Sequence, residues 1–201
     1  MEYTNANEIN RLSTAAQELS SAPPESFLDV LEEWGCTWLW DDMQLTGGTE
    51  WLGESISKNC LMAVTDGSFI RELLPDFSSA CLIFECTQGR DRLIVIFAEH
   101  SAVANAYRGE LLGLMSIHLL LLSVHRISPD LQCSVKIYSD CLGAMGRVAD
   151  LPPNRIPTRC RHSDIVKTIL VNCSGLPFSC IYEHVKAHQD DDRKYDTLLL
   201  R

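Results

Sequence analysis

The 201 residues carry a net charge of −10, and 46% of them are hydrophobic, which argues against a disordered chain and predicts a buried core. The negative charge lies mainly in the first 60 residues, where eleven acidic side chains accompany only two basic ones. The rest of the chain is nearly neutral, so its charge does not prevent it from approaching a polyanion.

The N-terminus is polar and acidic, and the longest mainly apolar stretch, residues 119–124, is far too short to span a bilayer. We therefore expect neither a secretory signal nor a membrane span. The nine cysteines are odd in number and include no C-x-x-C pair, which favours free thiols over a disulfide framework or a zinc site. Together these features predict an intracellular protein, cytoplasmic or nuclear, that is not secreted and does not act at a membrane.

Residues 1–58 form an acidic N-terminal extension or connecting segment. Apolar spacing predicts an amphipathic helix over residues 9–19, and a second helix covers residues 25–34. The segment contains all four tryptophans of the chain: Trp34, Trp38, Trp40 and Trp51. Because acidic residues surround these rings and would repel phosphate, we expect them to dock on the following domain rather than stack on bases.

Residues 59–201 alternate between strand and helix patterns. Strands are predicted at residues 61–68, 79–86, 93–97, 134–139 and 178–184, and helices at residues 102–125, 141–149 and 161–172. This order predicts an α/β fold whose mixed five-stranded sheet has three antiparallel strands followed by parallel strands, with helices on both faces. Right-handed crossovers would place the first and fourth of these strands side by side and parallel.

Three acidic residues should meet at one edge of that sheet. Asp66 ends the first strand, Asp140 ends the fourth, and Glu110 lies on the long helix between Gly109 and Gly113, which allow a close approach to the sheet. Taken singly, the acids have ordinary interpretations as a turn residue, a helix N-cap and a half-exposed helix residue. Together, clustered carboxylates repel one another unless cations neutralise them, and oxygen-only ligation suits Mg²⁺ or Mn²⁺.

Four short blocks contain or follow these acids. In chain order they are T-D-G-S at residues 65–68, Y-R-G-E-L at 107–111, Y-S-D at 138–140 and H-V-K-A-H at 184–188. As an ordered set they resemble the signature blocks of ribonuclease H (RNase H) domains, and most closely those at the end of reverse transcriptases of retrotransposable elements. The resemblance extends from about residue 38 to the C-terminus and includes the segment that connects such domains to the polymerase.

The resemblance implies cleavage of the RNA strand of an RNA–DNA hybrid. It implies that Asp66, Glu110 and Asp140 hold two Mg²⁺ ions, with Mn²⁺ as an alternative, and that His188 assists water activation or product release. It also implies two partners, the hybrid itself and a reverse transcriptase module within a longer polyprotein. The family has a fourth acid in a final helix; we expect both to be missing here, with the acids at residues 190–192 as partial substitutes or as a solvated loop.

Other polar residues are candidates for nucleic-acid contact. Arg155, Arg159 and Arg161 could bind phosphates, although a solvated basic helix start is an equally good interpretation. Three hydroxyl residues near the acids could contact the backbone or 2′-hydroxyls, namely Thr65, Ser68 and Ser139.

Two alternatives to an active RNase H stay open. One is a truncated, catalytically impaired domain that binds nucleic acid or a protein partner. The other is an integrase or transposase core, against which the blocks at residues 107–110 and 184–188 argue.

Overall fold

The computed structural model of the chain describes residues 9, 11–12, 26–150 and 160–186. Its helical elements are α2 (Phe27–Glu33), the short 3₁₀ helix η1 (Thr37–Leu39), α3 (Glu50–Ser57), α4 (Ala106–Ile127), α5 (Leu142–Asp150) and α6 (Ser163–Gly175). Its strands are β1 (Gln44–Leu45), β2 (Leu61–Ser68), β3 (Phe77–Cys86), β4 (Arg92–His100), β5 (Ser134–Ser139) and β6 (Ser179–His184).

The strands form one mixed sheet in the order β1-β4-β3-β2-β5-β6. The β2–β3 and β3–β4 pairs are antiparallel, whereas β2–β5 and β5–β6 are parallel, as the sequence predicts. The predicted count of five strands is wrong by one, because β1 adds to the outer edge through the antiparallel pair Gln44↔Ile94. A strand of two residues is too short to produce an alternating sequence pattern, which explains why it was not predicted.

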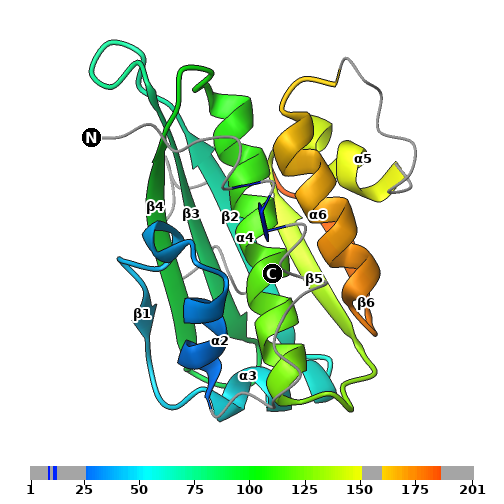
Figure 1. Ribbon diagram of the computed structural model, residues 1–201. Coiled ribbons are helices and arrows are strands. Elements are labelled where there is room, and N and C mark those ends of the chain that lie inside the picture. Colours follow the sequence, from blue (N-terminus) through cyan, green and yellow to red (C-terminus); the bar gives the residue numbers. More distant parts are fainter. Residues whose placement is uncertain (1–8, 10, 13–25, 151–159, 187–201) are drawn as a thin grey trace.

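Helix α4 is the centre of the core. Every residue from Arg108 to Val124 is buried, and the helix lies against β2 and β3 with α6 beside it (Figure 1). By length and composition α4 could also cross a membrane, but 83% of its most apolar window is buried within the fold. It is therefore the central helix of a packed domain.

The sheet has one face that is covered by the described helices. In β2, Leu61, Ala63 and Thr65 are buried towards α4, while Met62 and Val64 alternate to the other face and are half-buried. The helices in the described part of the chain gather on the α4 side (Figure 1). Helices on the second face, which the sequence also predicts, are not among the described elements.

The tryptophan-rich segment packs on this core. The Trp34 indole Nε1 donates a hydrogen bond to Ser123 Oγ at 2.9 Å, and the Trp38 ring meets Phe97 edge-on with 5.6 Å between centroids. Trp34 and Trp40 are 4% and 9% exposed. The predicted docking of the tryptophans is confirmed for these side chains, and the domain boundary at residue 58 stays a prediction.

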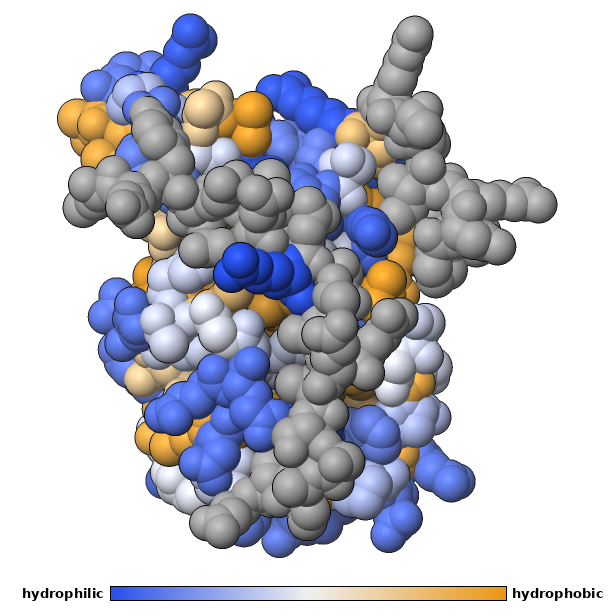
Figure 2. All heavy atoms as spheres, viewed as in Figure 1, coloured by the Kyte–Doolittle hydropathy of each residue, from blue (hydrophilic) through white to orange (hydrophobic). Residues whose placement is uncertain are grey.

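The visible face of the molecule carries both hydrophilic and hydrophobic residues (Figure 2). On the face seen in Figure 2, hydrophilic and hydrophobic residues are interspersed rather than separated into two regions. Scattered exposed apolar side chains, such as Leu73 at 74% and Leu142 at 63%, are ordinary on a protein surface in water.

Candidate metal centre

The predicted acidic cluster forms at the end of the β2–β5 pair. Thr65 pairs with Ser139 in the parallel ladder, so the next residues, Asp66 and Asp140, lie beside each other. Glu110 projects towards them from the second turn of α4, and one carboxylate oxygen from each of the three acids lies within 4.8 Å of the others. Asp66 is exposed, Asp140 is half-buried and Glu110 is 7% exposed, so the cluster opens to solvent on one side.

Glycines allow helix α4 to come this close to the sheet. A Cβ atom on Gly67 would lie 2.7 Å from the backbone carbon of Gly109, and a Cβ on Gly109 would lie 2.6 Å from the Ser79 carbonyl oxygen. A Cβ on Gly113 would collide with the Thr65 hydroxyl. The close approach that the sequence predicts from Gly109 and Gly113 is therefore confirmed, and Gly67 is the matching residue on the strand.

Glu110 is the acid of the cluster whose negative charge is least favourable in this structure. The Gly67 backbone N–H donates a hydrogen bond to Glu110 Oε1 at 2.9 Å, whereas the buried Oε2 has no hydrogen-bond partner among the described residues. Burial, together with the negative charges of Asp140 and Asp66, raises the pKa of Glu110 to about 7 despite that hydrogen bond. A cation beside Oε2 would relieve both the missing partner and the repulsion, so the residues present fit a divalent metal ion.

Of the three hydroxyl residues predicted to contact nucleic acid, two are buried and one is exposed. Thr65 and Ser139 are 2% and 0% exposed, so they lie beneath the carboxylates, and this arrangement does not support direct contact with a nucleic acid. The Ser139 hydroxyl oxygen accepts the Cys141 backbone N–H at 3.0 Å, which holds the turn that carries Asp140. Ser68 lies at the exposed end of β2, and its contact with nucleic acid stays a prediction.

His184 supports the site in a way that the sequence did not predict. It ends β6 opposite Ser139, and its Nε2–H can donate a hydrogen bond to the Asp140 backbone carbonyl oxygen, 3.1 Å away. The neighbouring Val185 N–H donates to the Ser139 carbonyl at 3.1 Å. The end of β6 therefore fixes the backbone of Asp140. In the sequence, this role could have been predicted from the position of His184 at the end of a strand that runs beside the strand of Asp140.

A buried ion network anchors the start of α4, and the sequence did not predict it either. Arg108 is 2% exposed and donates to both carboxylate oxygens of Glu99, at 2.5 and 2.6 Å, and to Asp164 Oδ2 at 3.0 Å. Its Nη1 also lies 3.2 Å from His162 Nδ1. The network joins β4, α4 and α6 on the turn that precedes Glu110, so it fixes the helix that carries this acid.

Several predicted site residues lie outside the described part of the chain. His188, Arg155 and Arg159 belong to this group, as do the acids at residues 190–192. Arg161 is described and exposed, immediately before the N-terminus of α6. Its contact with phosphate stays a prediction.

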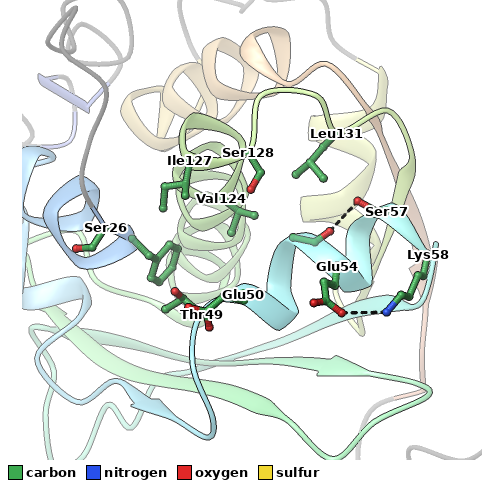
Figure 3. Close-up of a pocket in the computed structure, with 12 residues that line it drawn as sticks. Ser26, Thr49, Glu50, Glu54, Ser57, Lys58, Val124, Ile127, Ser128 and Leu131 are labelled. Carbon is green, nitrogen blue, oxygen red and sulfur yellow. Dashed lines mark hydrogen bonds and ion pairs between the residues drawn. The ribbon is translucent and has the colours of Figure 1, made fainter.

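A hollow of about 620 Å³ lies at the other end of α4. It opens between the start of α2, helix α3 and the last turn of α4, where Val124 and Ile127 form an apolar wall (Figure 3). Lys58 and Glu54 form an ion pair of 2.9 Å along its rim. None of the three clustered acids lines this hollow, so it is separate from the candidate metal centre.

Comparison of this chain with known proteins finds similar three-dimensional structures but no match to a protein-family model or to a curated protein. Among solved structures, the chain is similar to the N-terminal RNase H domain of a Mycobacterium tuberculosis protein, with 13% identity, a TM-score of 0.43, and coverage of 65% of this chain and 85% of that one. It is also similar to RNase H1 of the archaeon Halobacterium salinarum, with 10% identity, a TM-score of 0.42 and coverage of 65% and 89%.

A third similar structure is the protease–reverse transcriptase of prototype foamy virus. It shows 15% identity and a TM-score of 0.46, and the match covers 68% of this chain but only 19% of that one. The structures similar to this chain thus include RNase H domains. Because the TM-scores are this low, the functional proposal below rests on the residues of the chain itself.

Proposed function

We propose that this chain is a metal-dependent nuclease that hydrolyses the RNA strand of RNA–DNA hybrids. The observation that carries the proposal is the convergence of Asp66, Glu110 and Asp140 within 4.8 Å, with one buried Glu110 oxygen left without a described partner. Three carboxylates that approach this closely from three separate elements require positive charge. Their oxygen-only chemistry suits Mg²⁺ or Mn²⁺ rather than zinc.

The three acids would hold the metal, and the other residues would keep them in place. Two bound Mg²⁺ ions would supply the Lewis acidity that activates water and stabilises the leaving oxygen of a phosphodiester. Glu110 would be deprotonated with a metal bound, because a nearby cation would offset the burial and the neighbouring carboxylate charges that raise its pKa. Ser139 and His184 hold the Asp140 turn from below and beside it. We assign proton movement at the reacting water to His188.

The proposal also includes the binding of the RNA–DNA hybrid and the place of the chain in a longer protein. The near-neutral charge of residues 61–201 is compatible with binding a nucleic-acid duplex once the acids are neutralised. Arg161 and Ser68 are exposed, so they are available to contact its backbone. We further propose that the chain acts inside the cell, in the cytoplasm or nucleus, alongside a reverse transcriptase module within a longer polyprotein.

A substrate panel tests the proposed activity. The full chain is incubated with Mg²⁺ or Mn²⁺ and with three end-labelled duplexes of the same sequence: RNA–DNA hybrid, double-stranded RNA and double-stranded DNA. We expect cleavage of the RNA strand of the hybrid and no cleavage of double-stranded DNA. Binding of the hybrid without turnover with either metal would contradict the proposed nuclease and favour a binding module, and strand transfer on DNA would identify another class of enzyme.

A further inference from the structure

Two cysteine sulfurs meet at the end of the β2–β3 ladder. Cys60 immediately precedes β2, Cys86 is the last residue of β3, and their Sγ atoms are 3.4 Å apart. The backbone fixes this proximity, because Leu61 pairs with Cys86 in the ladder and the Thr87 N–H donates to the Cys60 carbonyl at 2.9 Å. Neither residue belongs to the acidic cluster or to its supporting contacts.

The distance between the sulfurs is compatible with a covalent bond after a small side-chain movement. A disulfide requires about 2.05 Å between the sulfurs. Rotation of the two side chains can close the remaining gap, because the paired strands already hold the two backbones next to each other. All nine cysteines of the chain are free thiols, so the pair is reduced in this structure.

The environments of the two thiols differ in a way that suits a reaction in two steps. Burial opposes ionisation of Cys86, but polar contacts with Ser55, the backbone N–H groups of Gln88 and Gly89, and Cys60 outweigh it and lower the pKa of the Cys86 thiol. Burial raises the pKa of Cys60, as do its contacts with Cys86. Cys86 is half-buried and Cys60 is 4% exposed, so the more ionised sulfur is also the more accessible one.

We propose that Cys60 and Cys86 form an oxidation site for hydroperoxides, in which Cys86 is the attacking thiolate and Cys60 the resolving thiol. In the first step the Cys86 sulfur attacks a peroxide oxygen, the O–O bond breaks, and the leaving hydroxide takes a proton to become water. This leaves a sulfenic acid on Cys86. In the second step the Cys60 sulfur attacks the Cys86 sulfur, the S–O bond breaks, and hydroxide leaves as water with the Cys60 proton. Two thiols and one hydrogen peroxide thus give one disulfide and two waters.

The bond would tie the start of β2 to the end of β3 and leave the acidic cluster in place. Asp66 lies six residues further along β2, which at about 3.3 Å per residue is about 20 Å from Cys60. We therefore expect oxidation to stabilise the fold by closing a loop, with no change in metal binding by the carboxylates. The inference does not depend on the proposed nuclease activity.

Peptide mapping of the oxidised full-length chain tests the inference. After treatment with one equivalent of hydrogen peroxide at neutral pH, we expect the free thiols to fall from nine to seven and a peptide linking Cys60 to Cys86 to appear without reductant. Dithiothreitol should restore all nine thiols. A different cysteine pair in the linked peptide, or conversion of Cys86 to sulfinic acid without a link, would overturn the proposal.

Three serine variants separate the roles of the two sulfurs. In Cys60→Ser the reaction should stop at a Cys86 sulfenic acid that dimedone labels, and in Cys86→Ser peroxide consumption should slow about tenfold because the attacking thiolate is lost. Cys133→Ser is the matched control, since its half-buried thiol donates its hydrogen bond to the Ser57 carbonyl oxygen, at 3.3 Å, and not to either sulfur of the Cys60–Cys86 pair. Equal rates for the wild type and Cys86→Ser would also contradict the assignment.

Discussion

Gly67 on strand β2 donates its backbone N–H to the carboxylate of Glu110 on helix α4 at 2.9 Å, with no side chain between the two elements. This bond connects strand β2, which carries Asp66, to the helix that carries the second acid. The carboxylates converge only because the helix lies directly on the backbone of the strand. The absence of a side chain at Gly67 is therefore a condition for assembly of the site.

Gly67→Ala should separate the strand from the helix. Its Cβ would lie 2.7 Å from the Gly109 carbonyl carbon, and backbone atoms cannot move aside as a flexible side chain can. We expect a loss of about 1–3 kcal/mol in the free energy of unfolding, measured by urea denaturation, together with loss of metal binding. Gly143→Ala is the control, because its Cβ would make an ordinary 3.6 Å contact with Tyr107. Equal stability of the two variants would contradict the proposed close packing.

Divalent metal should stabilise the folded protein through Glu110. A ligand that binds only the folded state at about 100 times its Kd adds about 2.7 kcal/mol, which corresponds to a rise in Tm of about 5–10 °C for a chain of this size. We expect Mg²⁺ or Mn²⁺ to produce such a shift in a thermal unfolding experiment and Glu110→Gln to remove it. Glu54→Gln, which changes an exposed carboxylate on α3, should keep the shift. A shift of the same size in Glu110→Gln would show that the metal binds elsewhere.

Arg108→Met should destabilise the protein strongly. The substitution leaves Glu99, which is 0% exposed, as a buried carboxylate without its cation. Removing one partner of a buried pair costs about 3–5 kcal/mol. Arg92→Met removes a pair with Glu85 in which the arginine is 46% exposed, so it should cost less than about 1 kcal/mol. Chemical denaturation of both variants measures the difference, and similar losses would mean that the buried network contributes little.

His162 should make the protein sensitive to acid. Burial lowers its pKa from 6.5 to about 4, and the cations Arg108 and Arg161 act in the same direction. As the pH falls from about 6.5 to about 4, the unfolded state binds a proton that the folded state rejects, so stability decreases across this window. His162→Asn removes the titration, and asparagine tolerates the left-handed backbone at this position, where φ is 57°.

The measurement for His162 is the change in unfolding free energy between about pH 7 and about pH 4, which should be smaller in the variant by about 1–2 kcal/mol after solvent screening. Parallel pH profiles for the wild type and His162→Asn would contradict this account.

The acidic cluster could be predicted because its members have positions that simple rules define. The crossover rule places the strands of Asp66 and Asp140 side by side, and each acid directly follows the last pair of their parallel ladder, Thr65↔Ser139. Glu110 follows Gly109 in a helix where two closely spaced glycines suggest close packing. The structure confirms that all three meet. Such predictions depend on local pattern and chain order, both of which a single sequence contains.

Other features depend on contacts between distant parts of the chain, and the sequence did not reveal them. Arg108 finds its acidic partners 9 and 56 residues away, on β4 and α6, without a motif that marks them. The eight residues of α3 lie within the tryptophan segment, where no clear helical pattern stands out. The start of α4 was predicted four residues too early, because the Asn105 side chain caps the helix by accepting the Arg108 N–H at 3.0 Å.

The rate of RNA-strand cleavage by carboxylate variants tests the central claim most directly. Asp66→Asn and Asp140→Asn each remove the charge of one proposed metal ligand while keeping its size. In a Mg²⁺-dependent assay on labelled RNA–DNA hybrid, each should reduce the rate by about 1,000-fold or more, because several kcal/mol of transition-state stabilisation are lost. Asp130→Asn, an exposed carboxylate in the loop after α4, should keep the wild-type rate. Cleavage by Asp66→Asn at the wild-type rate, in a protein that remains folded, would contradict the assignment of the metal centre.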